Sequence, residues 1–146
     1  MSNKLPLALT HQVRDQCLCL HVQRAARALA RRFDDALRPV GLNQGQFSLL
    51  MSLNRPAAPT IGEVSALLAL DRTTLTANLK PLERRGLVKV KVDTEDKRSR
   101  RLVLTDAGRA VLVAAAPIWK RAHARTERLL KSAPAEIVRK SLSELC

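Results

Sequence analysis

The segment from Asp71 to Thr105 reads DRTTLTANLKPLERRGLVKVKVDTEDKRSRRLVLT, and two different periodicities meet within it. The leucines of its first half recur at steps of three and four residues, which predicts a helix with one buried face. Apolar and polar residues then alternate over residues 87–92 and 101–104, which predicts two strands. Four of the five residues from 97 to 101 are basic. The segment therefore predicts a helix followed by a β-hairpin with a cationic tip.

A second short helix is expected directly before this one. Residues 60–63 read TIGE, in which Thr60 can cap a helix while Glu63 bonds back to it. This helix can last only until about Leu70, because Asp71 is itself a good N-cap for the next helix. Two short helices joined by a tight turn and followed by a charged hairpin form a winged helix-turn-helix.

Longer helices are expected on both sides of this unit. The chain from Arg14 to Arg38 contains neither Gly nor Pro and repeats apolar residues at helical spacing, which predicts one long amphipathic helix. Residues 43–46, NQGQ, offer a capping box for a shorter helix. Another long helix is expected from Asp106 to about Lys131, bent at Pro117, before a last short one.

The fold class expected from these elements is mainly α with a small β-hairpin wing. A chain of 146 residues is long enough for one domain with a real core and too short for two. We expect a single domain over residues 1–146, with residues 43–104 as the winged helix-turn-helix. Residues 10–40 and 106–146 then form the N- and C-terminal helices that flank it.

The charge of the chain indicates a polyanionic partner. The sequence holds 26 Lys and Arg against 13 Asp and Glu, a formal charge of +13, and such an excess is typical of proteins that bind nucleic acid or anionic membranes. Tyr is absent, and the aromatic residues are Phe33, Phe47 and Trp119. This scarcity argues against RNA or single-strand binding by base stacking. Double-stranded DNA is the favoured partner.

Other functional classes find no support in the sequence. The apolar stretch from Val111 to Trp119 is nine residues long and contains a proline, whereas a membrane span needs roughly 20 apolar residues. We therefore predict a cytoplasmic protein that does not enter the membrane. The sequence shows no glycine-rich phosphate loop, nucleophile elbow or cluster of His and carboxylates, so neither an enzyme nor a cofactor site is predicted.

The exposed face of the second short helix has the chemistry needed in a major groove. Short side chains let the helix backbone approach the bases, Thr hydroxyls can bond base edges or phosphates, and cations can neutralise phosphates. An arginine at the hairpin tip can enter the narrow minor groove, directed by a bond from Asp96. The residues expected to bind DNA are Arg72, Thr73, Thr74, Thr76, Ala77, Lys80 and Arg84 on the helix and Asp96, Lys97, Arg98 and Arg100 on the wing.

The run IGEVSALLALDRTTLTANLKPLERRGLVKVKVDTEDKRSRRLVLTDAGRAVL, residues 61–112, resembles the DNA-binding core of the MarR family of bacterial transcription regulators. Its pieces LERRGLV and DKRSRRLVLTDAG are similar to the family's LEKRGLV and DRRxxxVxLTxxG patterns. The resemblance implies that Asp96 and Arg98 match the family's wing Asp and Arg. Ala77 departs from relatives that carry Arg there, so we expect Lys80, Thr73 or Thr76 to carry more of the discrimination between sequences.

The resemblance also implies an assembly and a mode of control. It implies a homodimer in which the helices of residues 10–40 and 106–146 intertwine and place two winged modules on a pseudo-palindromic operator. It further implies a repressor released by a small-molecule effector, such as an aromatic or phenolic acid, bound between the dimerisation helices and the winged module. His21, Trp119 and His123 are candidate effector-binding residues. The alternatives are core packing for Trp119 and a solvated side chain for His123.

Two alternative functions stay open. One is a non-specific architectural protein that compacts DNA, and the other is a redox-sensing regulator that uses Cys17, Cys19 or Cys146. On a helix, Cys17 and Cys19 point about 200° apart and cannot bridge each other or share a metal ion. Cys17 and His21 supply two metal ligands at most, so no metal site is predicted. Across a dimer, however, Cys146 of one chain can approach Cys17 or Cys19 of the other.

Overall fold

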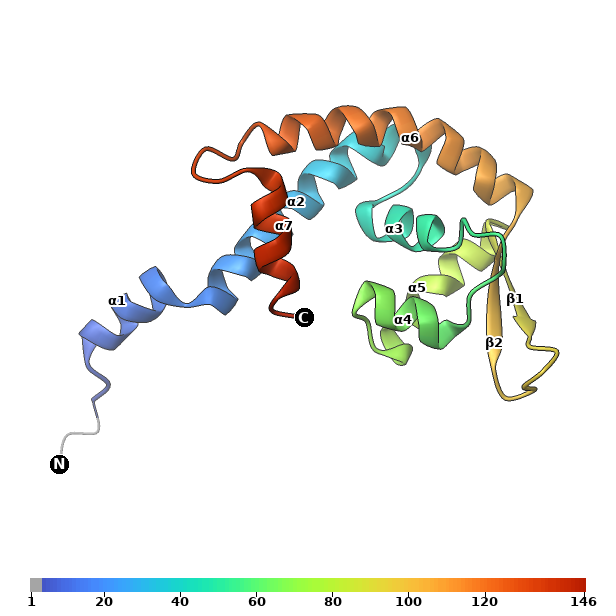
Figure 1. Cartoon of the computed structure of the whole chain (residues 1–146), viewed down its shortest axis with the longest axis horizontal. Helices are drawn as coiled ribbons and strands as arrows, with labels where there is room; N and C mark the ends of the chain where they lie inside the picture. Colours follow the sequence, from blue (N-terminus) through green and yellow to red (C-terminus); the bar gives the residue numbers. More distant parts are fainter. Residues whose placement is uncertain (1–3) are drawn as a thin grey trace.

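Seven α-helices and one β-hairpin follow one another along residues 4–146, the part of the chain that the computed structural model describes. In Figure 1, α6 spans the top of an arch, with α1 and α2 extending to one side and α3, α4, α5 and the hairpin on the other. The fold is therefore mainly helical with a small wing, as predicted. The elements are α1 (Leu7–Gln16), α2 (Leu18–Leu37), the 3-10 turn η1 (Arg38–Val40), α3 (Gln44–Ser52), α4 (Ile61–Leu68), α5 (Arg72–Arg84), β1 (Val88–Val92), β2 (Arg100–Leu104), α6 (Asp106–Glu127) and α7 (Ala135–Ser143).

Both predicted capping boxes are present. The Asn43 side chain accepts a bond from the Gln46 amide at 2.8 Å, and the Gln46 side chain accepts one from the Asn43 amide at 3.1 Å. The Thr60 hydroxyl and the Glu63 carboxylate make the same reciprocal pair at the start of α4. Each box satisfies two amides that the first helical turn leaves without partners, which explains why these helices begin where they do.

The leucine face of α5 lies in the core of the winged module. Leu75 and Leu82 are fully buried and Leu79 is nearly so. The hairpin closes the same core, because Leu102 in β2 is fully buried and pairs with Val90 across the antiparallel register. Burying this face fixes the opposite face of α5 toward solvent, which is what a recognition helix requires.

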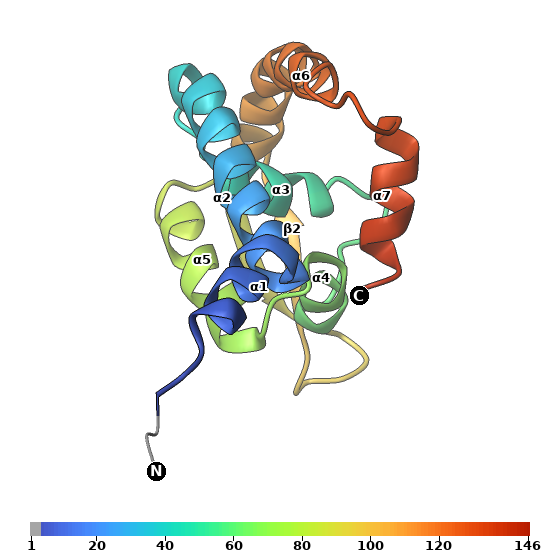
Figure 2. The ribbon, with the colours of Figure 1, turned by 90° about the vertical axis from the view of Figure 1, so that its left-hand side faces the viewer.

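The N-terminal helix is not continuous, and the prediction of a single helix from Arg14 to Arg38 is wrong at Cys17. The backbone is extended at Cys17 (φ −68°, ψ 110°), so α1 ends at Gln16 and α2 begins at Leu18. No residue of α1 is buried, so no packing holds it in register with α2. In Figure 2, α1 projects beyond the end of α2. The Cys17 sulfur caps α2 by accepting a bond from the Leu20 amide at 3.4 Å.

The C-terminal helices differ from the prediction in their boundary. Pro117 lies inside α6, and α6 ends at Glu127 instead of near Lys131. The Leu129 and Leu130 amides bond to carbonyls three residues back, which tightens the chain into a turn before α7. Among residues 4–146, no helix is both long and apolar enough to cross a lipid bilayer.

Candidate nucleic-acid interface

The exposed face of α5 gathers most of the predicted helix residues on one surface. Thr73, Thr76 and Ala77 are exposed, and Arg72 and Lys80 stand beside them on the same side of the helix. Together these five residues line a single shallow depression of about 360 Å³. The surface is shallow and open. Short side chains lie at its centre, and one cation lies toward each end. A surface of this kind lets a helix backbone approach the edges of base pairs.

Two predicted residues of α5 lie outside this depression. The Thr74 amide donates to Asp71 Oδ1 at 2.7 Å and its hydroxyl to Asp71 Oδ2 at 2.9 Å, so Thr74 belongs to the N-terminal cap of the helix. These bonds from Thr74 hold the pKa of the Asp71 carboxyl below its usual value. Arg84 is exposed in the last turn of α5, beyond the depression. It can therefore meet phosphates only outside the main surface.

The start of α3 borders the same face of α5, which the sequence analysis did not anticipate. Ala77 and Asn78 of α5 line a second cavity of about 340 Å³ together with Asn43, Gly45 and Gln46 of α3. The capping box revealed that a helix begins at Asn43, but no sequence signal places that helix end beside α5. Gln46 and Asn78 are thus further polar residues near the candidate DNA surface.

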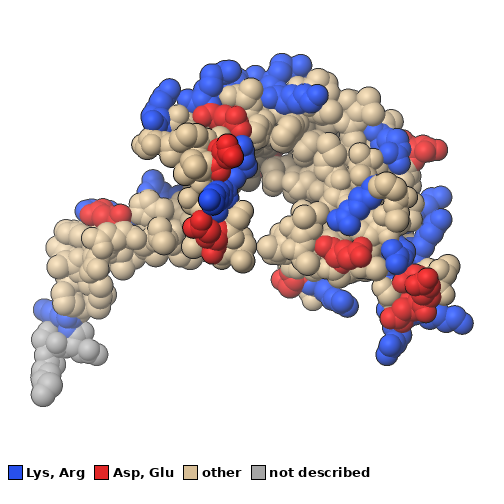
Figure 3. Space-filling model, viewed as in Figure 1, with Lys and Arg blue, Asp and Glu red and all other residues tan. Residues whose placement is uncertain are grey.

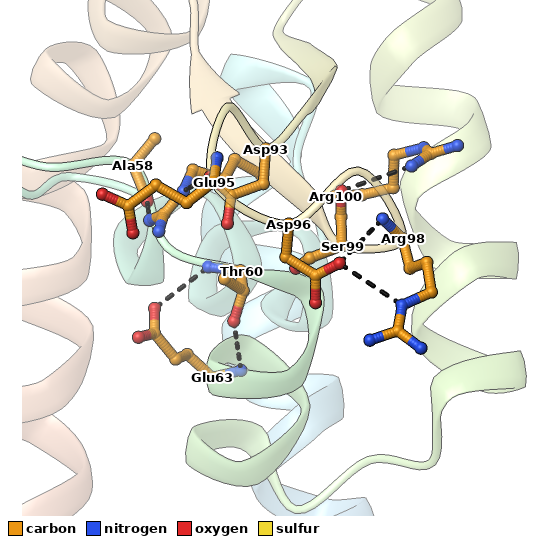
Figure 4. A network of polar contacts seen from close by, with 10 residues as sticks. Ala58, Thr60, Glu63, Asp93, Glu95, Asp96, Arg98, Ser99 and Arg100 are labelled. Carbon is orange, nitrogen blue, oxygen red and sulfur yellow. Dashed lines mark hydrogen bonds and ion pairs between the residues drawn. The ribbon is translucent and has the colours of Figure 1, made fainter.

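The wing tip presents Arg98 to solvent. The Arg98 side chain is 94% exposed. Asp96 Oδ1 accepts the Arg98 amide at 3.0 Å and lies 3.5 Å from Arg98 Nε. Figure 4 shows the Arg98 guanidinium beyond the Asp96 carboxylate, on the outer side of the loop. The predicted bond between Asp96 and an arginine is present, and its shorter contact orders the loop backbone.

The second arginine of the tip behaves differently. Arg100 is the first residue of β2, and its Nη1 donates to the carbonyls of Lys97 and Ser99 at 3.0 and 3.3 Å. Its guanidinium therefore braces the turn, whereas Arg98 projects from it. In Figure 3, Lys and Arg surround the hairpin at the lower right with acidic residues among them, and further Lys and Arg follow the outer surface of the arch.

The candidate effector residues divide between two cavities. The Trp119 ring stacks on Phe47 at a centroid distance of 6.1 Å and on His123 at 4.7 Å. Trp119 and Phe47 line a cavity of about 440 Å³ with Met51 of α3 and residues of α4. His21 and His123 instead line a larger, mainly apolar cavity of about 580 Å³ between α2, α6 and α7. His21 and Trp119 therefore do not share a site.

The cysteines are accessible, and Cys17 and Cys19 do not lie on one continuous helix as predicted. Cys19 and Cys146 are exposed, and Cys17 is partly exposed. The angle of about 200° assumed a continuous helix, but Cys17 lies in extended backbone. Within residues 4–146, no three His, Cys, Asp or Glu side chains gather as a metal site would require.

Comparison of the sequence with known proteins identifies similar transcriptional regulators. The sequence profile of the MarR family matches residues 42–99, which run from the start of the winged module to the wing tip. The transcriptional regulator TtmR of Methylorubrum extorquens is 35% identical over 97 residues, 66% of this chain and 50% of TtmR. The organic hydroperoxide resistance transcriptional regulator of Bacillus subtilis is 29% identical over 98 residues, 67% of each protein. The chain thus spans about half the length of TtmR.

Solved structures extend the similarity over nearly the whole chain. The crystal structure of the M. tuberculosis transcriptional regulator MosR in complex with DNA has a TM-score of 0.81 and 38% identity, covering 89% of this chain and 93% of MosR. A mutant of E. coli MarR, complexed with operator DNA, has a TM-score of 0.80 and covers 92% of this chain and 96% of its own. Its identity of 21% supports a shared fold only.

Proposed function

Because this chain belongs to the MarR family, we propose that it is a transcriptional regulator that binds a specific sequence of double-stranded DNA as a homodimer. The observation that carries the proposal is the exposed surface of α5 formed by Arg72, Thr73, Thr76, Ala77 and Lys80, with Arg98 projecting from the neighbouring wing. MosR, a similar protein, has been crystallised with DNA. DNA binding also implies that the protein works in the cytoplasm, where bacterial DNA lies.

In this proposal α5 lies in the major groove. Thr73 and Thr76 contact base edges through hydroxyls and methyls, while Arg72 and Lys80 bind phosphates or guanine. Ala77 lets the helix sit close to the bases but supplies no hydrogen bond, so the sequence preference depends more on Lys80. Arg98 enters the adjacent minor groove, where a narrow groove strengthens the negative potential.

The homodimer is supported by apolar surface that the single chain leaves uncovered. Leu7, Leu9 and Val13 of α1 and Ile137 and Leu142 of α7 are all exposed, and none of α1 is buried. The apolar cavity between α2, α6 and α7 lies in the same part of the molecule. A second copy packed there would cover these residues and space two α5 helices about 34 Å apart, as a pseudo-palindromic operator requires. Size-exclusion chromatography with light scattering tests this, and a monomer at micromolar concentration would contradict it.

We further propose that the protein is a repressor released by an aromatic or phenolic acid bound in the cavity beside Trp119. This cavity joins α3 and α4 of the winged module to α6, and its walls include Phe47 and Met51. A flat ring in this cavity can pack against Phe47, Met51 and the edge of Trp119, whose ring already stacks on Phe47 and His123. A ligand that favours a different spacing of the two α5 helices must weaken DNA binding by linkage.

Redox control is the second candidate for regulation, favoured by the exposure of Cys19 and Cys146. A relative carries the name organic hydroperoxide resistance transcriptional regulator. One hydroperoxide would oxidise two thiols on different chains to a disulfide and be reduced to an alcohol and water. A peroxide-dependent dimer on a non-reducing gel that disappears in Cys146→Ser supports this route, and its absence in the wild type excludes it.

The test of DNA recognition is a titration of a labelled operator at several salt concentrations. The operator is first selected from random duplexes, and specific binding should exceed binding to bulk DNA by at least about a thousandfold. A smaller ratio would favour the architectural alternative. Arg98→Ala should lower the salt slope by about one unit per half-site, whereas Lys80→Ala should alter the sequence preference. Lys89→Ala, which removes an equal charge from the exposed side of β1, is the matched control and should change the slope less.

A further inference from the structure

An ion pair that no sequence motif predicts lies where the two strands of the wing meet its tip loop. Arg101 Nε in β2 donates to Asp93 Oδ1 at 3.2 Å, just beyond the end of β1. Asp93 is 8% exposed, and its amide donates to the Ser99 carbonyl at 3.0 Å across the loop. The pair therefore closes the base of the tip loop, at the end of the strand ladder away from α5 and α6.

The same arginine joins the hairpin to another part of the chain. Arg101 Nη1 donates to the Ala58 carbonyl at 2.6 Å, and the Leu102 amide donates to the Pro59 carbonyl at 2.9 Å. Arg101 also forms a β-bridge with Thr60, the N-cap of α4. Figure 4 shows Asp93, Ala58 and Thr60 together on the side of the wing away from Arg98. Because α4 packs against α5, this contact ties the wing to the recognition helix.

The burial of Asp93 and its bond to Arg101 indicate that this pair supports the wing internally. A carboxylate close to the phosphates of DNA is unfavourable for binding, yet Asp93 is largely buried at the base of the tip loop. The hydrogen bond from Arg101 lowers the pKa of Asp93, and the same bond raises the pKa of Arg101. Two of the three guanidinium nitrogens of Arg101 are occupied inside the protein. Both features fit an internal support and not a DNA contact.

We propose that Asp93 and Arg101 are positioning residues that set the distance and angle between the wing tip and α5, so that Arg98 meets the minor groove while α5 occupies the major groove. This inference rests on the proposed function, because it needs a DNA complex in which both elements bind. Without the link to Ala58 the hairpin keeps its fold but is held less firmly against α4. Arg98 is then ordered only at the moment of binding, which costs affinity.

The sharpest test is Asp93→Asn, because its change in charge and its loss of the ion pair should change the affinity for DNA in opposite directions. The substitution makes the protein more positive, so the general electrostatic effect would tighten binding to DNA. Loss of the ion pair should instead weaken binding to the selected operator by about fivefold, the scale of one net hydrogen bond. Glu95→Gln is the matched control, since Glu95 is exposed on the same loop and loses the same charge. It should tighten binding by roughly twofold or leave it unchanged.

Both substitutions are repeated with Arg98→Ala as the background. If Asp93 acts through Arg98, then Asp93→Asn no longer weakens binding there, and the two changes together equal Arg98→Ala alone. A thermal melt of each variant confirms that it is folded at the assay temperature. If Asp93→Asn fails to fold, Arg101→Lys replaces it. Lys keeps the net charge but lacks the planar guanidinium whose two nitrogens bond to Asp93 and Ala58. Its effect on DNA binding should likewise disappear in the Arg98→Ala background.

The outcomes distinguish a failure of the positioning role from a failure of the proposed DNA-binding function. Tighter binding by Asp93→Asn, or losses that multiply with Arg98→Ala, would overturn the positioning role and leave DNA recognition intact. Failure of the wild type to prefer any duplex over bulk DNA would overturn the proposed function itself, and this inference with it.

Discussion

Gly108 offers the most direct test of how the wing is joined to α6. It lies in the first turn of α6, and its amide donates to the Thr105 hydroxyl at 3.0 Å. A Cβ at this position would lie 2.3 Å from the Leu87 carbonyl oxygen and 2.8 Å from Leu104 Cδ1. The first of these atoms belongs to the backbone and accepts the Thr105 amide, so it cannot move away freely. Gly108→Ala therefore forces α6 and the start of the hairpin apart.

The size of the effect follows from opposing contributions. Overpacking of a buried site costs about 1–3 kcal/mol, and weakening the bond between Thr105 and Leu87 adds about 1 kcal/mol. The higher helix propensity of Ala offsets about 1 kcal/mol of this loss of stability. We expect Gly108→Ala to lower the free energy of unfolding by about 2 kcal/mol, or roughly 4–8 °C in Tm for a chain of this size.

Gly45→Ala is the matched control, because it makes the same chemical change at an exposed position in the first turn of α3. The nearest atom to a Cβ at Gly45 is Asn43 Oδ1 at 3.6 Å, an ordinary contact. This variant should gain about 0.5–1 kcal/mol from helix propensity. Urea denaturation followed by circular dichroism, at one fixed protein concentration, measures both variants. Equal stability of Gly108→Ala and the wild type would refute the close approach of α6 to Leu87.

Two further predictions concern pH and the core. The pKa values of Asp71 and Asp93 are lowered in the folded chain by hydrogen bonds from Thr74 and Arg101, so both carboxylates stabilise the fold above the ordinary Asp pKa of about 4. The urea concentration at the unfolding midpoint should therefore fall as the pH drops below about 4, and equal midpoints at about pH 6 and about pH 3 would contradict this. Leu79→Ala removes a side chain that is 2% exposed and should cost about 2–5 kcal/mol in urea denaturation, and a cost below about 1 kcal/mol would show that α5 is not anchored by this face.

Local interactions explain why much of the fold could be predicted from the sequence. The capping boxes at Asn43 and Thr60 join residues three apart, so the residues that begin each helix are readable directly. The leucine spacing of α5 likewise identified its buried face and, by difference, the surface that carries Thr73 and Lys80. Gly86, which follows the end of α5, adopts the left-handed conformation that favours glycine.

Contacts between distant residues decided what the sequence could not show. Arg101 and Ala58 are 43 positions apart, so no periodicity or motif predicts the bond that ties the wing to α4. The sequence likewise did not predict that residues of α3 lie beside Ala77. It also did not distinguish the two arginines of the wing tip, of which Arg98 projects into solvent and Arg100 bonds to carbonyls of the turn. The break at Cys17 has a related cause. The apolar spacing and the absence of Gly and Pro predicted continuity there. No residue of α1 is buried, however, and tertiary packing supplies most of the stability of a helix.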